Sequence, residues 1–91
     1  MSVIGREDAR DDVARITSYI AHDNPVAAGQ VARALFIAGE SLVDFPRRGR
    51  LGRVAATREL IAYRPYIIVY EIDAEGDVHI LRVWHGAQDR L

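Results

Sequence analysis

The stretch from Arg58 to Trp84 constrains the fold of this chain more than any other. β-branched and aromatic residues dominate it, while Gly, Asp and Pro interrupt it. This composition is typical of strands that are joined by tight turns. We expect three antiparallel strands, one beginning at residue 53 or 57 and ending at 62, one over 66–72 and one over 78–84. In the hairpin loop between the last two strands, Gly76 is expected to adopt a left-handed conformation.

Two helices are predicted upstream of these strands. Between residues 7 and 21, apolar residues recur with helical spacing, and the charged residues fall mainly off their stripe. The stripe consists of Ala9, Val13, Ile16 and Ile20, and the charged residues are Asp8, Asp11, Asp12 and Arg15. Asn24 as the N-cap and Pro25 at the first helical position then start a second helix, which should run to about Val43. Its apolar positions include Ala28, Val31, Ala32, Leu35, Phe36 and Leu42.

Length and composition limit the class of protein. The chain has 91 residues, enough for one domain over 1–91, and 49% of them are hydrophobic, so a core can form. There is no cysteine, and the three histidines lack the spacing of metal ligands, so we expect no disulfide, metal or cofactor. No apolar run approaches the roughly 20 residues that span a bilayer, and the N-terminus lacks the apolar region of a signal peptide. We therefore expect a cytoplasmic protein without a membrane partner.

These elements predict an α+β fold, in which a short strand over residues 1–5 precedes a two-helix hairpin packed on one face of a three- to four-stranded antiparallel sheet. Both faces of the central strands are apolar, which is unusual for an antiparallel sheet. The face expected toward the helices carries Tyr66, Ile68, Tyr70 and Ile72. The opposite face is expected to carry Ile67, Val69, Leu81 and Val83. Because the rest of the chain is too short to cover that face well, we expect a partner protein to cover it.

All 12 basic residues are arginine, and half of them lie in the middle of the chain. Residues 47–70 hold six arginines and one glutamate, although the net charge of the whole chain is −1. Four of these arginines surround two glycines in a predicted loop: Arg47, Arg48, Arg50 and Arg53. Such a loop is either a solvated, mobile connection or a surface for an anionic partner, such as nucleic acid or an acidic segment of another protein. The sequence leaves both interpretations open.

Five stretches follow one another in an order and at a spacing that are informative together. They are Asp23-Asn24-Pro25, Phe45-Pro46-Arg47-Arg48-Gly49-Arg50, Thr57-Arg58-Glu59-Leu60, Pro65-Tyr66-Ile67-Ile68-Val69-Tyr70 and Ile80-Leu81-Arg82-Val83-Trp84-His85-Gly86. The whole chain resembles the ParE/RelE superfamily of bacterial type II toxins through them. The resemblance implies a growth-inhibiting toxin that a separate small antitoxin neutralises by wrapping around it. That implication agrees with the partner expected on the uncovered face.

The superfamily has two main branches, which the central strand helps to separate. The resemblance implies that RelE-like members cleave mRNA on the ribosome with a central-strand arginine and a C-terminal Tyr or His, whereas ParE-like members inhibit DNA gyrase without nuclease activity. RNA cleavage needs a general base, a general acid and a cation beside the phosphate. Here Ile67 occupies the central-strand position, and no Tyr follows Trp84. We therefore favour a gyrase inhibitor that is not an enzyme, with the four loop arginines as target contacts.

A ribosome-dependent mRNA endonuclease remains the alternative function. Its candidate catalytic residues would have to converge on an open face: Arg50, Arg58, Glu59, Arg82 and His85. His85 is the best acid–base candidate because the unperturbed pKa of histidine is near neutrality, although a strand-end histidine is more often structural. Glu59 is more often an ion-pair partner, here of Arg58 or Arg64, than a catalytic base.

A third interpretation is a toxin-fold module that is no longer toxic and acts only in the autoregulation of its operon. In all three interpretations the expected partner is a cognate antitoxin, and operator DNA would be contacted only through it. The expected antitoxin contacts are the outer-face residues Ile67, Val69, Leu81 and Val83.

Overall fold

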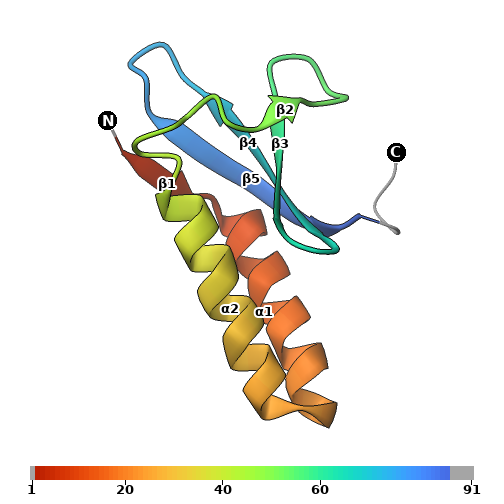
Figure 1. Ribbon diagram of the computed structural model, residues 1–91. Coiled ribbons are helices and arrows are strands. Elements are labelled where there is room, and N and C mark those ends of the chain that lie inside the picture. Colours follow the sequence, from red (N-terminus) through yellow and green to blue (C-terminus); the bar gives the residue numbers. More distant parts are fainter. Residues whose placement is uncertain (1, 87–91) are drawn as a thin grey trace.

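A computed structural model describes residues 2–86 and places two helices against one face of a five-stranded sheet (Figure 1). The elements follow in chain order as β1 (Val3–Gly5), α1 (Glu7–Asp23), α2 (Pro25–Glu40), β2 (Arg50–Leu51), β3 (Arg58–Tyr63), β4 (Tyr66–Ile72) and β5 (Val78–His85). The strand order across the sheet is β1-β5-β4-β3-β2, and only the β1–β5 pair is parallel. The predicted α+β fold is confirmed.

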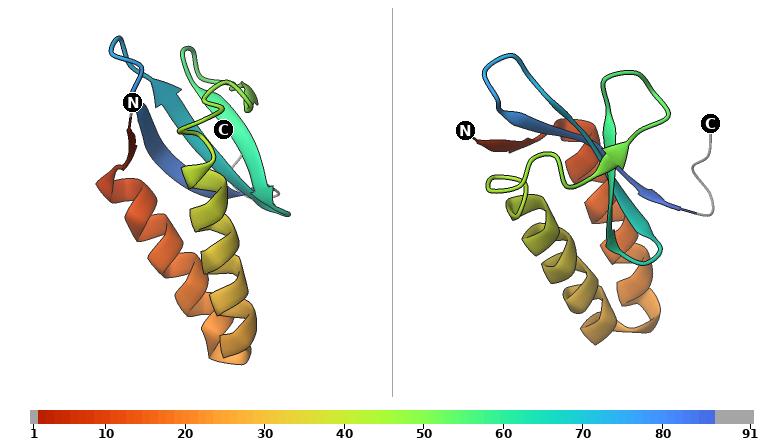
Figure 2. Two further views of the ribbon diagram at one scale, coloured as in Figure 1. Left: turned by 60° about the vertical axis from the view of Figure 1, so that its left-hand side comes forward. Right: turned by 45° about the horizontal axis from the view of Figure 1, so that its top comes forward.

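The two helices form the predicted antiparallel hairpin, and its closed end projects beyond the sheet (Figure 2). Helix α2 begins where the sequence predicts, because Asn24 Oδ1 accepts a hydrogen bond from the Ala27 N–H at 3.0 Å and Pro25 occupies the first turn. It ends at Glu40, three residues before the predicted end at Val43. The chain then leaves the helical axis through hydrogen-bonded turns, in which Ser41 Oγ donates to the Ala38 carbonyl at 2.6 Å.

The core lies between the helix hairpin and the face of β4 that carries Ile68 and Tyr70. Both side chains are buried, and Tyr70 is completely inaccessible to solvent. Residues from α2, the following turn and the neighbouring strands complete this cluster: Val31, Leu35, Leu42, Leu60, Val78 and Val83. The predicted inward face of β4 is therefore confirmed. Three residues of the predicted apolar stripe of α1 pack against the same cluster, namely Val13, Ile16 and Ile20.

The sheet is larger and less uniform than the sequence predicts. The predicted N-terminal strand is present as β1, but it pairs in parallel with β5, and β2 is an additional edge strand that forms inside the predicted loop. The Gly76 backbone has φ 87°, as expected for the β4–β5 hairpin. Two-residue β2 carries no alternating pattern, so its pairing depends on the loop around it and not on its own sequence.

A bulge in β5 overturns the predicted faces of that strand. Val69 pairs with Arg82 and Tyr70 pairs with Ile80, so Leu81 is the extra residue. The bulge turns Val83 into the core, where it is 2% exposed, and places Arg82 and Trp84 on the outer face. The assignment of Val83 to the outer face is therefore wrong, because strict alternation fails at Leu81.

The outer face of the sheet does not form the extended uncovered apolar surface that the sequence predicts. Ile67 is 8% exposed and Val69 is 5% exposed. On this face Ile67 lies between Ile61 and Trp84, and Val69 lies between Glu59 and Arg82. The prediction failed because it counted only the helices as cover. Long side chains from the flanking strands of a narrow sheet can also cover the strand between them.

Candidate functional site

The arginine loop (residues 45–57) is fixed to the core by the hydroxyl group of Tyr70. This hydroxyl donates a hydrogen bond to the Pro46 carbonyl at 2.6 Å and accepts one from the Gly49 N–H at 3.0 Å. A Cβ atom at Gly49 would lie 2.7 Å from the same hydroxyl oxygen, so this position needs glycine. The Tyr70 ring is buried, so the first half of the loop is attached to an immobile part of the molecule.

Arginine side chains complete the attachment of this first half. Arg58 Nη1 donates to the Gly49 carbonyl at 2.9 Å and to the Arg47 carbonyl at 3.3 Å. Arg48 Nη1 donates to the Ser41 hydroxyl at 2.8 Å, which ties the loop to the end of α2. These contacts satisfy loop carbonyls that would otherwise rely on water.

The second half of the loop is held by Glu59 and Thr57, which are both buried. The two carboxylate oxygens of Glu59 accept hydrogen bonds from Arg50 Nη2 at 3.1 Å and from the Arg53 N–H at 3.4 Å. Thr57 Oγ1 donates to the Val54 carbonyl at 2.7 Å, and the Thr57 carbonyl accepts from the Gly52 N–H at 2.8 Å. Buried polar groups therefore organise the whole loop, which argues against a mobile connection.

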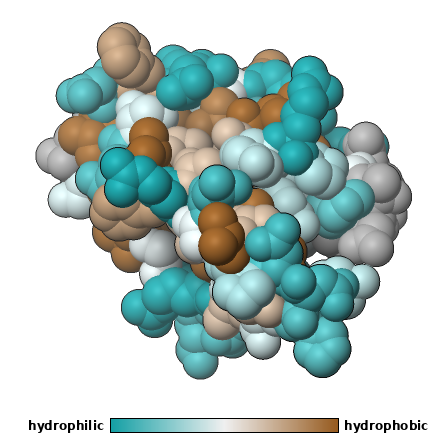
Figure 3. All heavy atoms as spheres, turned by 60° about the horizontal axis from the view of Figure 1, so that its bottom comes forward, coloured by the Kyte–Doolittle hydropathy of each residue, from teal (hydrophilic) through white to brown (hydrophobic). Residues whose placement is uncertain are grey.

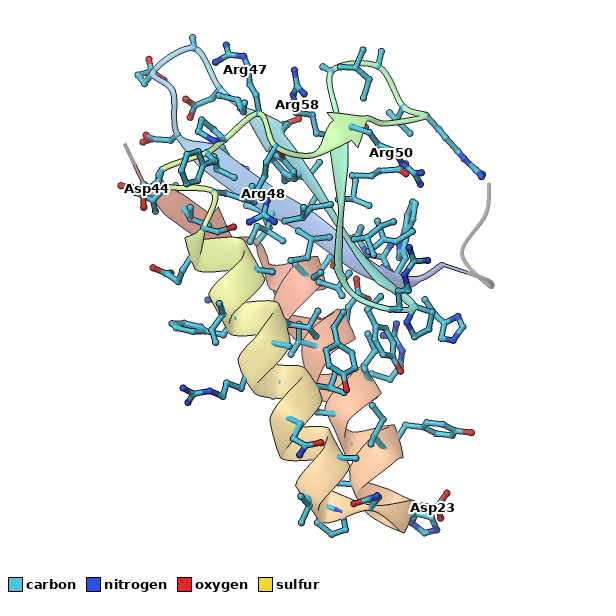
Figure 4. The ribbon with its side chains drawn as sticks, in the orientation of Figure 1. Asp23, Asp44, Arg47, Arg48, Arg50 and Arg58 are labelled. Carbon is cyan, nitrogen blue, oxygen red and sulfur yellow. The ribbon has the colours of Figure 1, made fainter. Side chains whose placement is uncertain are left out.

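The four arginines expected to contact a target do not form one patch. Because Leu51 pairs with Arg58 and Arg58 pairs with Tyr70, these three side chains share the helix-side face of the sheet. Arg50 lies on the opposite face, where Glu59 neutralises its charge. Arg47 and Arg58 lie at the end of the sheet that is farther from the helices, whereas Arg48 turns toward the end of α2 (Figure 4). Within residues 2–86 the Arg47 guanidinium has no hydrogen-bond or carboxylate partner.

The five candidate nuclease residues are not brought together either. Glu59 binds Arg50 and not Arg58 or Arg64, and Arg58 lies on the opposite face of the sheet. Arg82 Nε lies 2.7 Å from Asp12 Oδ2, and its guanidinium lies 5.9 Å from the centre of the Trp84 ring. His85 lies at the end of β5, with its ring edge-on to Tyr66 at 5.5 Å. Glu59, Arg50 and Arg82 share the outer face of the sheet, but Glu59 is buried, both arginines are held in ion pairs, and His85 lies at the end of β5.

Asp12 is a buried carboxylate, although it does not belong to the apolar stripe predicted for α1. It is 1% exposed and lies against β5 beyond the short β1 strand. Its carboxylate accepts hydrogen bonds from the Arg82 guanidinium and from the Val83 N–H at 2.9 Å. Burial alone would raise the pKa of Asp12, but these hydrogen bonds and one from Arg15 outweigh it, so the pKa lies below its usual value. The spacing of apolar residues along a helix cannot reveal a buried carboxylate.

A groove of about 480 Å³ opens between the two helices and the β1 end of the sheet. Its walls are mainly apolar and include Val13, Leu35, Phe36 and Ile80, with Arg10 and Glu40 also in the lining. Phe36 is 69% exposed, although the sequence places it among the apolar positions of α2. Seen from the helical end, hydrophobic side chains are exposed in separate groups between hydrophilic ones (Figure 3). Exposed large apolar side chains thus lie on the helices and in the arginine loop, and on the outer face of the sheet Ile61 is 44% exposed.

The family of the chain follows from sequence comparison. The sequence model of the ParE toxin of the type II toxin–antitoxin system parDE matches residues 3–90. This chain belongs to the ParE toxin family. Toxin RelE2 of Caulobacter vibrioides is 43% identical to it over 77 residues, which cover 85% of each chain. Putative toxin Y4kP of Sinorhizobium fredii is 45% identical over 74 residues, which cover 80% of this chain and 75% of the relative.

Solved structures agree with this membership. A chain of the chromosomal ParDE system from P. aeruginosa has a TM-score of 0.83 and 21% identity, over 93% of this toxin and 95% of that chain, and shows the shared fold. A chain of the toxin–antitoxin complex RelBE2 from Mycobacterium tuberculosis has a TM-score of 0.59 and 29% identity, over 92% and 95% of the two chains. The suspected superfamily is confirmed.

Among residues 2–86, no group of three or more histidine or carboxylate side chains could hold a metal ion. Neither helix in the described part of the chain is long and apolar enough to cross a membrane.

Proposed function

We propose that this ParE-family toxin acts by binding DNA gyrase and that it does not cut RNA. The observation that carries the proposal is the engagement of the candidate catalytic side chains. Arg50 and Arg82 are each held by a buried carboxylate, and apolar Ile67 occupies the second position of the central strand. A transition state for RNA cleavage needs preorganised charge and proton-transfer groups at one place. The arginine loop, with Arg47, Arg48, Arg50 and Arg53, would then serve as the target-binding surface.

A supercoiling assay with purified gyrase tests this proposal. Added toxin is expected to inhibit supercoiling, while mRNA on translating ribosomes stays intact. The His85→Ala variant is expected to inhibit as strongly as the wild type, because His85 has no catalytic task in this proposal. Normal supercoiling at excess toxin, together with cleaved mRNA, would refute it.

The ribosome-dependent endonuclease stays the second candidate, because the relatives from Caulobacter vibrioides carry the name RelE. For that function the engaged side chains would have to be rearranged on the ribosome. His85→Ala would then abolish growth inhibition, which separates the two functions in one experiment. Expression without any effect on growth would instead favour a module that acts only in operon autoregulation.

We also propose that the cognate antitoxin binds the groove between the helices and not the outer face of the sheet. The solved relatives come from toxin–antitoxin systems, which supports an antitoxin partner. The groove supplies exposed apolar surface around Phe36, whereas Ile67, Val69 and Val83 are at least nine-tenths buried. Amphipathic helices bind such grooves through their apolar faces.

A further inference from the structure

The helix-side part of the arginine loop combines cationic and apolar groups in one place. A hollow of about 510 Å³ is lined by Phe45, Pro46, Arg47 and Arg48. Arg58 lies beside it, because its guanidinium donates to the Arg47 and Gly49 carbonyls. Leu51 pairs with Arg58 and is 78% exposed. We call these side chains the loop patch: Phe45, Arg47, Arg48, Leu51 and Arg58.

The loop patch is preformed. Its backbone is held by the Tyr70 hydroxyl at Pro46 and Gly49, and Tyr70 itself has no solvent exposure. A surface whose backbone is already ordered loses little conformational entropy when a partner binds. Such rigidity is typical of a binding surface and is unnecessary in a plain connection between a helix and a strand.

The exposed apolar side chains of the loop patch favour a protein segment over a nucleic acid as its partner. The β4–β5 hairpin begins three residues after Tyr70, about 10 Å along the strand, and carries Asp73, Glu75 and Asp77. These carboxylates repel phosphates and peptide carboxylates alike, so an anionic partner is limited to a short contact at the arginines. Exposed Phe45 and Leu51 decide for a protein, because they find no complement along a phosphate backbone.

We infer that the loop patch binds a protein segment in which acidic and apolar residues alternate. The hollow receives an apolar side chain of this segment, and its carboxylates pair with Arg47 and Arg58. Arg47 contributes most to the selectivity for an acidic segment. Its guanidinium has no partner within residues 2–86, so it breaks no existing interaction when the segment binds. This inference rests on the proposed function in taking the arginine loop as the target-binding surface, and it adds the chemical class of the segment that is bound.

Fluorescence anisotropy with two labelled probes tests the inference on the full chain. The first probe is a peptide of about a dozen residues that alternates Glu with Leu, and the second is a single-stranded RNA of equal charge. The wild type is expected to bind the peptide more tightly. Arg47→Glu is expected to weaken peptide binding at least about tenfold, whereas the matched control Arg33→Glu changes it less than about twofold. Arg33 is an exposed arginine on α2, so both variants change the net charge equally.

Two further variants separate the apolar and the backbone contributions. Leu51→Ser is expected to weaken peptide binding without changing RNA binding. Tyr70→Phe removes only the hydroxyl, so it is expected to weaken peptide binding while the antitoxin still binds. Tighter binding of the RNA, or equal losses from Arg47→Glu and Arg33→Glu, would overturn the inference. The assay contains no gyrase, so its failure is distinct from a negative supercoiling result.

Discussion

Asp12 joins the first helix to the last strand by hydrogen bonds that reach across 70 residues of sequence. Its position beyond β1 explains its role, because the Val83 N–H would otherwise face a sheet edge with no strand partner there. Because the pKa of this carboxylate is lowered in the folded chain, Asp12 makes the free energy of unfolding depend on pH. An Asp whose pKa is lower in the folded than in the unfolded chain stabilises the fold above the unfolded pKa of about 3.9, and this stabilisation is lost as the pH falls toward the folded pKa.

The Asp12→Asn variant should therefore lower the free energy of unfolding at pH 7 by about 1–2 kcal/mol, because Arg82 loses its charged partner. It should also flatten the decline of stability below about pH 4. Urea unfolding followed by circular dichroism across pH measures both effects. Asp11→Asn, at an exposed neighbouring position, is the matched control. If the stability of Asp12→Asn falls as steeply below pH 4 as that of the wild type, the lowered pKa of Asp12 is not the cause of the decline.

Two glycines should respond to alanine with opposite signs. At Gly49, a Cβ atom would lie 2.7 Å from the Tyr70 hydroxyl and 3.0 Å from the Glu59 carbonyl, so Gly49→Ala should cost about 1–3 kcal/mol. At Gly29, on the exposed side of α2, a Cβ atom meets nothing within 4 Å. Gly29→Ala should therefore stabilise the helix by about 0.5–1 kcal/mol. Thermal melting of the two variants checks this contrast, and a shift of the same sign in both would refute it.

At the scale of secondary-structure elements, capping decides where α2 starts. Asn24 Oδ1 accepts a hydrogen bond from the Ala27 N–H, which has no acceptor within the helix, and Pro25 has no N–H that would need an acceptor. Asn24→Ala should destabilise the toxin by about 1 kcal/mol, whereas Asn24→Asp keeps a capping oxygen and should change stability by only a few tenths of that amount. Chemical denaturation of the three proteins gives the values. If both variants lose the same free energy of unfolding, the effect does not come from the N-cap hydrogen bond.

The elements predicted from sequence are those whose signals are local. β-branched residues, the Asn-Pro start of α2 and the loop around Gly76 each fix a short segment regardless of its surroundings. Strand β2 and the bulge at Leu81 depend on neighbours that are distant in sequence, so the pattern does not contain them. For the same reason the arginine loop was recognised by composition, but its anchoring by Tyr70 was not.

At the scale of the whole molecule, exposed apolar side chains lie on the helices, in the arginine loop and on β3, whereas the central strand is buried. Counting layers alone overestimates the exposure of Ile67 and Val69, which lie between residues of β3 and β5 and are buried. The family was nevertheless recognised, since the order of the stretches along the chain does not depend on which face is covered. The expected antitoxin-binding site does depend on which face is covered. Because the outer face is buried at Ile67 and Val69, we propose the groove as the antitoxin-binding site instead.

The groove makes one prediction about the complex with the antitoxin. Phe36→Ser should weaken antitoxin binding about tenfold or more, because an exposed aromatic anchor in the groove lining is lost. Val26→Ser is the matched control, since Val26 is 72% exposed on the same helix and does not line the groove. Isothermal titration with the purified antitoxin compares the two variants. Equal affinities would place the antitoxin elsewhere.

Tyr70 contributes its ring to the interior and its hydroxyl to the loop, and this double role governs how the toxin responds to heat. We expect a loop fixed in this way to stay ordered as long as the interior does, because its anchor is buried. Warming should therefore end the activity of the toxin in a single step, whereas in Tyr70→Phe, which lacks the anchor, the loop should loosen before the interior unfolds.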